Sequence, residues 1–200
     1  MADGESVYLA VPPGRSYLVT TGYIKLFDAG ANDHRIVRLL VGRGGLFGDR
    51  PFRESAFQGF LSPQAEHAVA HGRVELLQLD RKELEAAVRT QTELSVLMAE
   101  AMSARAEFLE RRLLWQFTSP VRARMAATLR DLVCFDGNRC EHGYTIDVRL
   151  THQDLAELVG AARPVVSAEL SRMREEGLIR YDRSYLCVDD LVRLDRIALG

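Results

Sequence analysis

The first part of the chain alternates short apolar runs with turn-forming residues. The runs have the two-residue period or the continuous apolar character of strands, and glycine, proline, asparagine and aspartate separate them. They cover residues 17–21, 23–27, 35–40, 65–70 and 73–79. Turns are expected at Gly22, at the tip formed by residues 30–33 and at His71-Gly72, because such residues tolerate a positive φ or hydrogen-bond their own backbone. The spacing predicts an all-β region over residues 7–79, folded as a sandwich or roll.

The period changes to that of helices at Asp80. We expect Asp80 to cap a short helix, with the acidic Glu83 three positions later and apolar residues from Leu84 onward. A longer helix is predicted over residues 92–117, where apolar residues recur every seven positions with others between them. This apolar stripe consists of Leu94, Leu97, Ala101, Ala104, Phe108 and Trp115.

The apolar stripe has two interpretations. It is either the dimer interface of two such helices, which small Ala101 and Ala104 would let approach closely, or the buried face of a helix packed on its own domain. The dimer is favoured, because a helix of about 39 Å is longer than a small domain needs. Ser119 and Pro120 predict the N-cap and first turn of a new helix over 120–133, and the junction 117–120 is expected to be a domain boundary and hinge.

Two short helices joined by a tight turn follow a polar loop at 136–143 and a strand at 144–150. Thr151, together with Asp154, is expected to cap the first helix, and Gly160 to end it. The second helix is expected to start around Arg163 and to end at Gly177. The runs 178–181 and 185–188 then predict a hairpin. This order of elements is typical of a winged helix-turn-helix.

The start of the second helix is where a helix-turn-helix reaches base edges in the major groove. The candidate base contacts there are Arg163, Val165, Ser167 and Ser171. Of these side chains, only the guanidinium of Arg163 can bind a guanine through two hydrogen bonds. Helix N-termini attract phosphate, so the start of the first helix predicts positioning contacts from Thr151, His152 and Gln153. Arg183, in the hairpin turn, is a further candidate DNA contact.

Composition limits the class of protein without identifying a ligand. The 200 residues are 47% hydrophobic and 27% charged, as in globular proteins of one large or two modest domains. Because the formal net charge is −2, any contact with nucleic acid depends on local clusters of cations. Three cysteines make no paired disulfide framework, the acidic N-terminus is unlike a signal peptide, and no apolar run reaches the roughly 18 residues of a membrane helix. We expect a cytoplasmic protein with no membrane contact.

Enzymatic and metal-binding motifs have weak support. The candidate metal ligands lack zinc-site spacing or the compact histidine pattern of a metal-binding roll. They are Cys134, Cys140, His142, His34, His67 and His71. The glycine-rich residues 42–48 lack the Lys-Ser/Thr ending of a phosphate-binding loop, and no Gly-x-Ser-x-Gly motif indicates a hydrolase. We therefore expect no catalytic residue, no metal, no cofactor and no enzyme activity.

These motifs together resemble the cyclic-AMP receptor protein / fumarate-and-nitrate-reduction regulator (CRP/FNR) family. The resemblance rests on Gly44-Gly-Leu-Phe-Gly-Asp49, the long helix and residues 150–160 and 163–179. It implies an α+β fold with a shortened, cyclic-nucleotide-binding-like β-roll at 1–91, a dimerisation helix at 92–117 and a winged helix DNA-binding domain at 118–200. It also implies a homodimeric, sequence-specific transcription regulator, expected to be an activator, whose partners are double-stranded promoter DNA and RNA polymerase. Residues 138–144 match the stretch that often meets the polymerase.

The resemblance also assigns DNA contacts by position. Thr151, His152 and Gln153 match phosphate contacts of the family, and Arg163 matches its leading base-reading arginine. Pro164 replaces an acidic residue and Ala168 replaces an arginine of the cyclic-AMP receptor. The preferred half-site is therefore expected to differ from that receptor's.

The roll departs from the family's cyclic-AMP pattern. Gln64-Ala65 stands where members that bind cyclic AMP hold its phosphate with an Arg-Ser or Arg-Thr pair, and Asp49 replaces a glutamate. Neither Gln64 nor Ala65 can neutralise a cyclic phosphate, so we expect regulation without cyclic AMP. Two alternatives stay open, a regulator gated by another small molecule and, more distantly, a roll-type enzyme with an attached DNA-binding domain.

Overall fold

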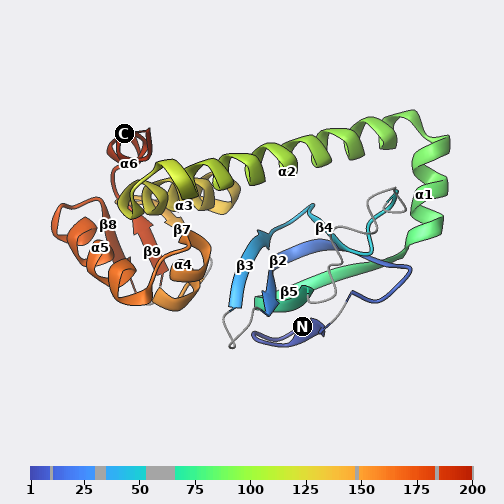
Figure 1. The fold of residues 1–200 in the computed structure, drawn as a ribbon, viewed down its shortest axis with the longest axis horizontal. Coiled ribbons are helices and arrows are strands. Elements are labelled where there is room, and N and C mark those ends of the chain that lie inside the picture. The colour runs from blue at the N-terminus through green and yellow to red at the C-terminus, as the bar shows by residue number, and fades with distance from the viewer. Residues whose placement is uncertain (10, 30–34, 53–65, 147–148, 183–184, 200) are drawn as a thin grey trace. The chain divides into compact units, whose positions relative to one another are not determined.

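The computed structural model describes residues 1–9, 11–29, 35–52, 66–146, 149–182 and 185–199 (Figure 1). The chain forms two compact units, Met1–Glu110 and Arg111–Gly200. Helix α2, Thr92–Thr118, begins in the first unit and ends in the second. The domain boundaries predicted after residues 91 and 117 stay predictions.

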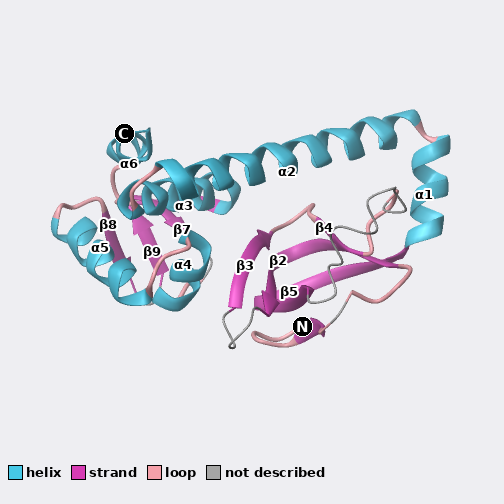
Figure 2. Cartoon of the chain, viewed as in Figure 1, coloured by secondary structure: helices cyan, strands magenta, loops and turns pink. Residues whose placement is uncertain are grey.

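The first unit is an antiparallel sheet followed by helix α1 and most of α2. Its strands are β1 (Ser6–Tyr8), β2 (Arg15–Ala29), β3 (Arg35–Val41), β4 (Leu46–Gly48) and β5 (Glu66–Asp80). The described strands pair in the order β1-β5-β2-β3, and β4 pairs with β2. The strand-rich N-terminal region predicted from the sequence is confirmed (Figure 2).

Two expected turns are bends within long strands. Gly22 and Gly72 have φ of 78° and 75°, yet the pairing of β2 with β5 continues past both, with register shifts on either side of Thr21. A Cβ at residue 22 would overlap the carbonyl oxygen of Arg73. The separate strands predicted at 17–21 and 23–27, and at 65–70 and 73–79, are thus wrong. Glycine at positive φ lets an antiparallel ladder absorb an irregularity without ending. The tip predicted at 30–33 lies outside the described residues.

The core of the first unit is formed by apolar side chains from the strands of this sheet. The rings of Tyr17 and Phe47 stack with their centroids 5.3 Å apart, and Tyr8 lies against both. The other buried members of the core are Val19, Ile24, Leu26, Val41, Ala68, Ala70 and Val74. Most of these residues come from the apolar runs noted in the sequence, whereas Tyr8, Val41 and Phe47 lie outside them, and the apolar side of the strands faces inward.

Helix α1 (Arg81–Thr90) begins as predicted. The Asp80 carboxylate accepts hydrogen bonds from the backbone N–H groups of Lys82 and Glu83, at 2.9 and 3.2 Å. This cap satisfies two of the N–H groups that a helix leaves unpaired at its start. The helix therefore starts directly at the end of β5.

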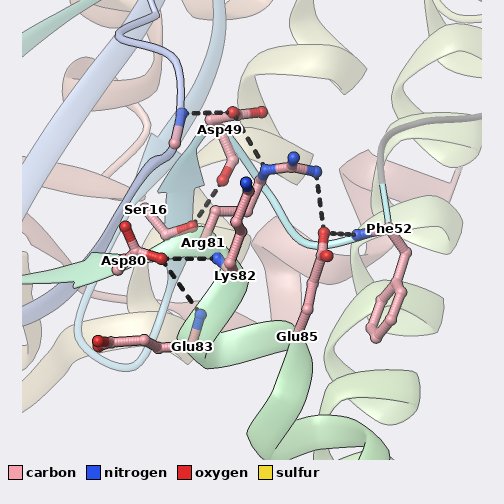
Figure 3. A network of polar contacts seen from close by, with 9 residues as sticks. Ser16, Asp49, Phe52, Asp80, Arg81, Lys82, Glu83 and Glu85 are labelled. Atoms are coloured by element: carbon pink, nitrogen blue, oxygen red, sulfur yellow. Dashed lines mark hydrogen bonds and ion pairs between the residues drawn. The ribbon is translucent and has the colours of Figure 1, made fainter.

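A buried arginine connects α1 to the sheet (Figure 3). The Arg81 guanidinium forms ion pairs with Asp49 at 3.3 Å and with Glu85 at 2.9 Å. Asp49 also accepts a hydrogen bond from the backbone N–H of Gly14 at 2.7 Å, and its carbonyl accepts one from Ser16 Oγ at 2.6 Å. An unpaired buried charge is strongly destabilising, so Arg81 and Asp49 depend on each other.

The second unit combines the end of α2 with a small sheet and four more helices. The helices are α3 (Val121–Asp136), α4 (His152–Val159), α5 (Arg163–Glu175) and α6 (Leu191–Leu199). The strands are β6 (Gly137–Cys140), β7 (Gly143–Ile146), β8 (Ile179–Asp182) and β9 (Tyr185–Val188), paired in the order β6-β7-β9-β8 among the described residues. Its core contains Met125, Leu129, Ile146, Leu155, Leu170, Met173, Leu178 and Leu194.

Three details of this unit differ from the sequence prediction. The polar loop predicted at 136–143 contains β6, which forms a hairpin with β7. The polar residues of β6 have little strand propensity, and its pairing with β7 makes it a strand. Helix α3 has Pro120 as its N-cap with no side-chain hydrogen bond, so Ser119 does not cap it. Proline holds an extended conformation there, with φ of −64° and ψ of 158°, and the helix begins after it. Helix α6 was not predicted, and residues 147–148 of the strand predicted at 144–150 lie outside the described residues.

Among the described residues, no helix combines the length and the apolar character needed to cross a membrane.

Candidate nucleic-acid interface

Helix α4 has a capped, exposed N-terminus. Thr151 Oγ1 accepts a hydrogen bond from the backbone N–H of Asp154 at 3.1 Å, and Asp154 Oδ2 accepts one from the backbone N–H of Thr151 at 2.9 Å. The Thr151 hydroxyl also donates to the same carboxylate oxygen at 2.6 Å. This reciprocal cap was predicted from the spacing of the two residues. Because the Thr151 hydroxyl donates its proton to Asp154, it could donate to a phosphate only if this hydrogen bond broke.

The other end of α4 is held by donors that sequence reasoning missed. Gly160 ends the helix with φ of 68°, as its position predicts. Arg124 donates to the carbonyls of Val159 and Gly160 at 3.1 and 3.2 Å, and Gln116 donates to Gly160 at 3.1 Å. Arg112 donates to the carbonyl of Leu158, and burial lowers the pKa of its guanidinium. These side chains satisfy carbonyls that the helix end leaves unpaired.

Helix α5 presents a mixed face to solvent and an apolar face to the core. Val166, Leu170 and Met173 are buried against the rest of the unit. Arg163 and Val165, in the first turn, are exposed, and 45% of Val165 is accessible. Within the described part of the chain, Arg163 makes no hydrogen bond or ion pair. Its guanidinium is thus available to an external acceptor.

The two serines of α5 are engaged within the protein. Ser167 Oγ lies 2.8 Å from His152 Nδ1, in the first turn of α4. Ser171 Oγ donates to the carbonyl of Ser167 at 3.1 Å. Gln153, which is exposed, donates from Nε2 to Glu157 at 2.9 Å. Of the predicted base contacts, Arg163 is therefore the one polar group that the described structure leaves uncommitted.

The predicted hairpin forms beside this helix pair. Strands β8 and β9 pair antiparallel, and Arg180 of β8 makes a salt bridge of 2.7 Å with Asp189. Arg183 lies outside the described residues. Arg149 is exposed and lies two positions before the N-cap of α4, where the alternating sequence pattern predicts a strand and gives no sign of a contact residue. Its guanidinium lies 5.7 Å from the centre of the Tyr185 ring.

The predicted dimer stripe lies on a helix without a buried residue. Of its 27 residues, none is buried within this chain. Leu94, Phe108 and Trp115 are half-buried, whereas Leu97, Ala101 and Ala104 are exposed. Leu97 is 61% exposed. An exposed apolar row on a long helix is the surface that a second helix would cover.

The interior of the first unit contains a polar cluster. Tyr8 donates to Glu66 at 2.5 Å, Arg38 pairs with the other oxygen of that carboxylate, and burial together with Glu66 raises the pKa of Tyr8. Arg105 of α2 donates to the Leu46 carbonyl at 3.2 Å, and burial lowers its pKa to about 10. The residues Gln64 and Ala65, which bear on cyclic-AMP binding, lie outside the described residues.

The candidate metal ligands that the structure describes do not come together in one group. The described residues contain no group of three or more His, Cys, Asp or Glu side chains able to hold a metal ion. His67 instead stacks on Phe27 with ring centroids 5.0 Å apart, and His34 lies outside the described residues. Hydrogen bonds from Thr145 and the backbone of His142 lower the pKa of the Cys140 thiol.

Comparisons with known proteins agree on one kind of protein. A family model described as a Crp-like helix-turn-helix domain matches residues 123–197. The global nitrogen regulator of Nostoc sp. (strain PCC 7120) is 31% identical over 186 residues, 92% of this chain and 81% of that protein. The CRP-like cAMP-activated global transcriptional regulator of Mycobacterium tuberculosis is 23% identical over 196 residues, 98% of this chain and 85% of that protein. A solved CRP/FNR-family transcriptional regulator from Thermus thermophilus matches with a TM-score of 0.77 at 25% identity, covering 100% of this chain and 97% of that one.

Proposed function

The chain belongs to the CRP/FNR family of DNA-binding transcription regulators, and from that premise we propose that it is a homodimeric activator that binds promoter palindromes without cyclic AMP. Its named relatives are regulators rather than enzymes, which supports a role without catalysis. The observation that carries the proposal is the exposed, uncommitted Arg163 in the first turn of α5.

Arg163 is well placed for base reading because its surroundings are rigid. The reciprocal cap of Thr151 and Asp154 holds α4, and the buried face of α5 packs on the same core. A guanidinium that enters the major groove from such a frame can donate two hydrogen bonds to one guanine. Arg149 and the start of α4 would contact phosphates on either side.

Two identical chains would place two such helices on DNA. The exposed part of the stripe, Leu97, Ala101 and Ala104, supports a parallel pairing of α2 helices. A two-fold dimer binds a palindrome, since each subunit reads one half-site. We propose that the bound dimer recruits RNA polymerase through the exposed tip of the β6–β7 hairpin, residues 138–144, and so activates transcription.

Independence from cyclic AMP is supported by the contacts that the Asp49 carboxylate already makes within the protein. Its carboxylate pairs with Arg81 and accepts from the backbone of Gly14. A sugar hydroxyl that used this carboxylate would compete with both partners. Gln64-Ala65 stands where the family's cyclic-AMP binders hold the phosphate, and neither of these two side chains can offset the phosphate charge. The mycobacterial relative named as cAMP-activated makes this a testable difference.

The test is a genome-wide footprint of the ligand-free protein, followed by titration of a recovered site. Binding is expected without any ligand and unchanged by millimolar cyclic AMP. Arg163→Ala is expected to lose about 1 to 3 kcal/mol of binding free energy on the specific site and far less on random DNA. Arg174→Ala, which removes an exposed arginine from the last turn of the same helix, serves as the control. Retained sequence preference in Arg163→Ala would refute the assignment.

Gating by another small molecule is the second candidate, and Arg105 favours it. Its Nε is buried without a hydrogen-bond partner in the described part of the chain, and Arg50 nearby also lowers its pKa. An anionic effector would pair with this charge and remove the penalty of burying it. This candidate predicts no specific footprint until the low-molecular-weight fraction of a cell extract is added, whereas a ligand-free footprint excludes it.

A further inference from the structure

We propose that Ser167 is a positioning residue that sets the tautomer of His152, and that it does not read bases. The hydroxyl of Ser167 and Nδ1 of His152 lie 2.8 Å apart, which joins the first turn of α4 to α5. The inference rests on the proposed function, in which His152 faces a DNA phosphate. It assigns a direction to this hydrogen bond, with Ser167 as donor and Nδ1 as acceptor.

The direction follows from what each tautomer offers to an anion. A neutral imidazole carries its proton on one nitrogen and a lone pair on the other. If Nδ1 accepts from Ser167, Nε2 carries the proton and can donate to a phosphate oxygen. If Nδ1 donates to Ser167, Nε2 presents a lone pair that repels the phosphate. A serine that donates to Nδ1 therefore selects the tautomer that binds DNA before DNA arrives.

The burial of the two serines separates their roles. Ser167 is half-buried between its helix and His152, whereas Ser171, one turn later, is exposed and bonds only to the backbone of its own helix among the described residues. A hydroxyl has one proton to donate. Once Ser167 gives it to His152, Arg163 is the remaining side-chain donor among the predicted base contacts on α5.

The first measurement needs no DNA, so its outcome is independent of the proposed function. In ¹⁵N-labelled protein above the titration range of histidine, long-range ¹H–¹⁵N correlation reports which ring nitrogen of His152 carries the proton. We expect the Nε2–H form, with a shift of the Nδ1 resonance in Ser167→Ala and none in Ser171→Ala. A protonated Nδ1 in the neutral ring would overturn the proposal.

The second measurement compares binding to the specific site and to random DNA of equal length. Ser167→Ala is expected to weaken both about two- to tenfold, as one lost hydrogen bond would, and to leave their ratio unchanged. Ser167→Thr, which keeps the hydroxyl, should restore affinity. With His152→Ala present, adding Ser167→Ala should have no further effect. A changed ratio or additive losses would overturn the proposal, whereas absence of specific binding by the wild-type protein would refute the proposed function instead.

Discussion

Single residues with unusual backbone geometry shape the roll. Gly22 and Gly72 both have positive φ, but their surroundings differ. At residue 22 the carbonyl of Arg73 occupies the space of a side chain, whereas a Cβ at residue 72 would meet no described atom within 4 Å. One glycine is required by conformation and close approach, the other by conformation alone.

This contrast gives a matched pair of substitutions. Gly72→Ala is expected to cost about 1 to 2 kcal/mol of unfolding free energy, the penalty of a left-handed conformation for alanine. Gly22→Ala is expected to cost roughly 1 to 3 kcal/mol more, because the backbone of Arg73 must move. Urea denaturation of both variants checks the order. Equal losses would mean that β2 and β5 separate freely at this bend.

Helix α2 carries several large apolar side chains that the described part of the chain does not cover. Leu97 is 61% exposed and Leu113 is 62% exposed, although they lie on different sides of the helix. Sixteen positions separate them, which corresponds to about 160° around the axis at 3.6 residues per turn. Leu97 belongs to the apolar stripe and Leu113 does not.

A charge placed at each of these positions tests the dimer. Leu97→Glu is expected to shift the protein toward monomers in sedimentation velocity runs at micromolar concentration, because two carboxylates would face each other across the helix pair. Leu113→Glu carries the same charge at equal exposure and should stay dimeric. If Leu113→Glu dissociates and Leu97→Glu does not, the interface lies on the other side of α2.

Elements with local signals were predictable, and those made by distant partners were not. The caps of α1 and α4, the stop at Gly160 and the β8–β9 hairpin follow from residues within a few positions of each other. The side chains that donate to the end of α4 are those of Gln116 and Arg124. They lie far from Gly160 in the sequence, and no sequence pattern predicts that they contact it. The bends at Gly22 and Gly72 were mistaken for turns, because a glycine at positive φ gives the same local signal in both settings.

At the scale of the whole molecule, a net charge of −2 gives no overall attraction to DNA. Affinity then depends on local cations and, in the proposed dimer, on two subunits that bind together. The sequence predicted the family and the place of the candidate interface. It could not show that the hydroxyl of Ser167 is engaged by His152, because that contact depends on the packing of α4 against α5.

Cooperation between subunits predicts a dependence on half-site spacing. Two half-sites one helical turn apart, about 34 Å, face the same side of DNA. Inserting five base pairs between the half-sites of a recovered palindrome should reduce affinity to that of a single half-site, since the second half-site then faces away. Titration of fluorescent duplexes measures this. Unchanged affinity after the insertion would show that one subunit suffices.

The donors on the end of α4 have a consequence for exchanging parts between relatives. Helix α4 is only eight residues long, and Arg112 and Gln116 of α2 donate to its last carbonyls. A graft that joined a foreign sensor at Ser119 would remove Arg112 and Gln116, so the Leu158 carbonyl would lose its donor and Gly160 would keep only Arg124 of its described donors. A transplanted DNA-binding unit should therefore include the last two turns of α2, and chimeras should be joined no later than Arg111.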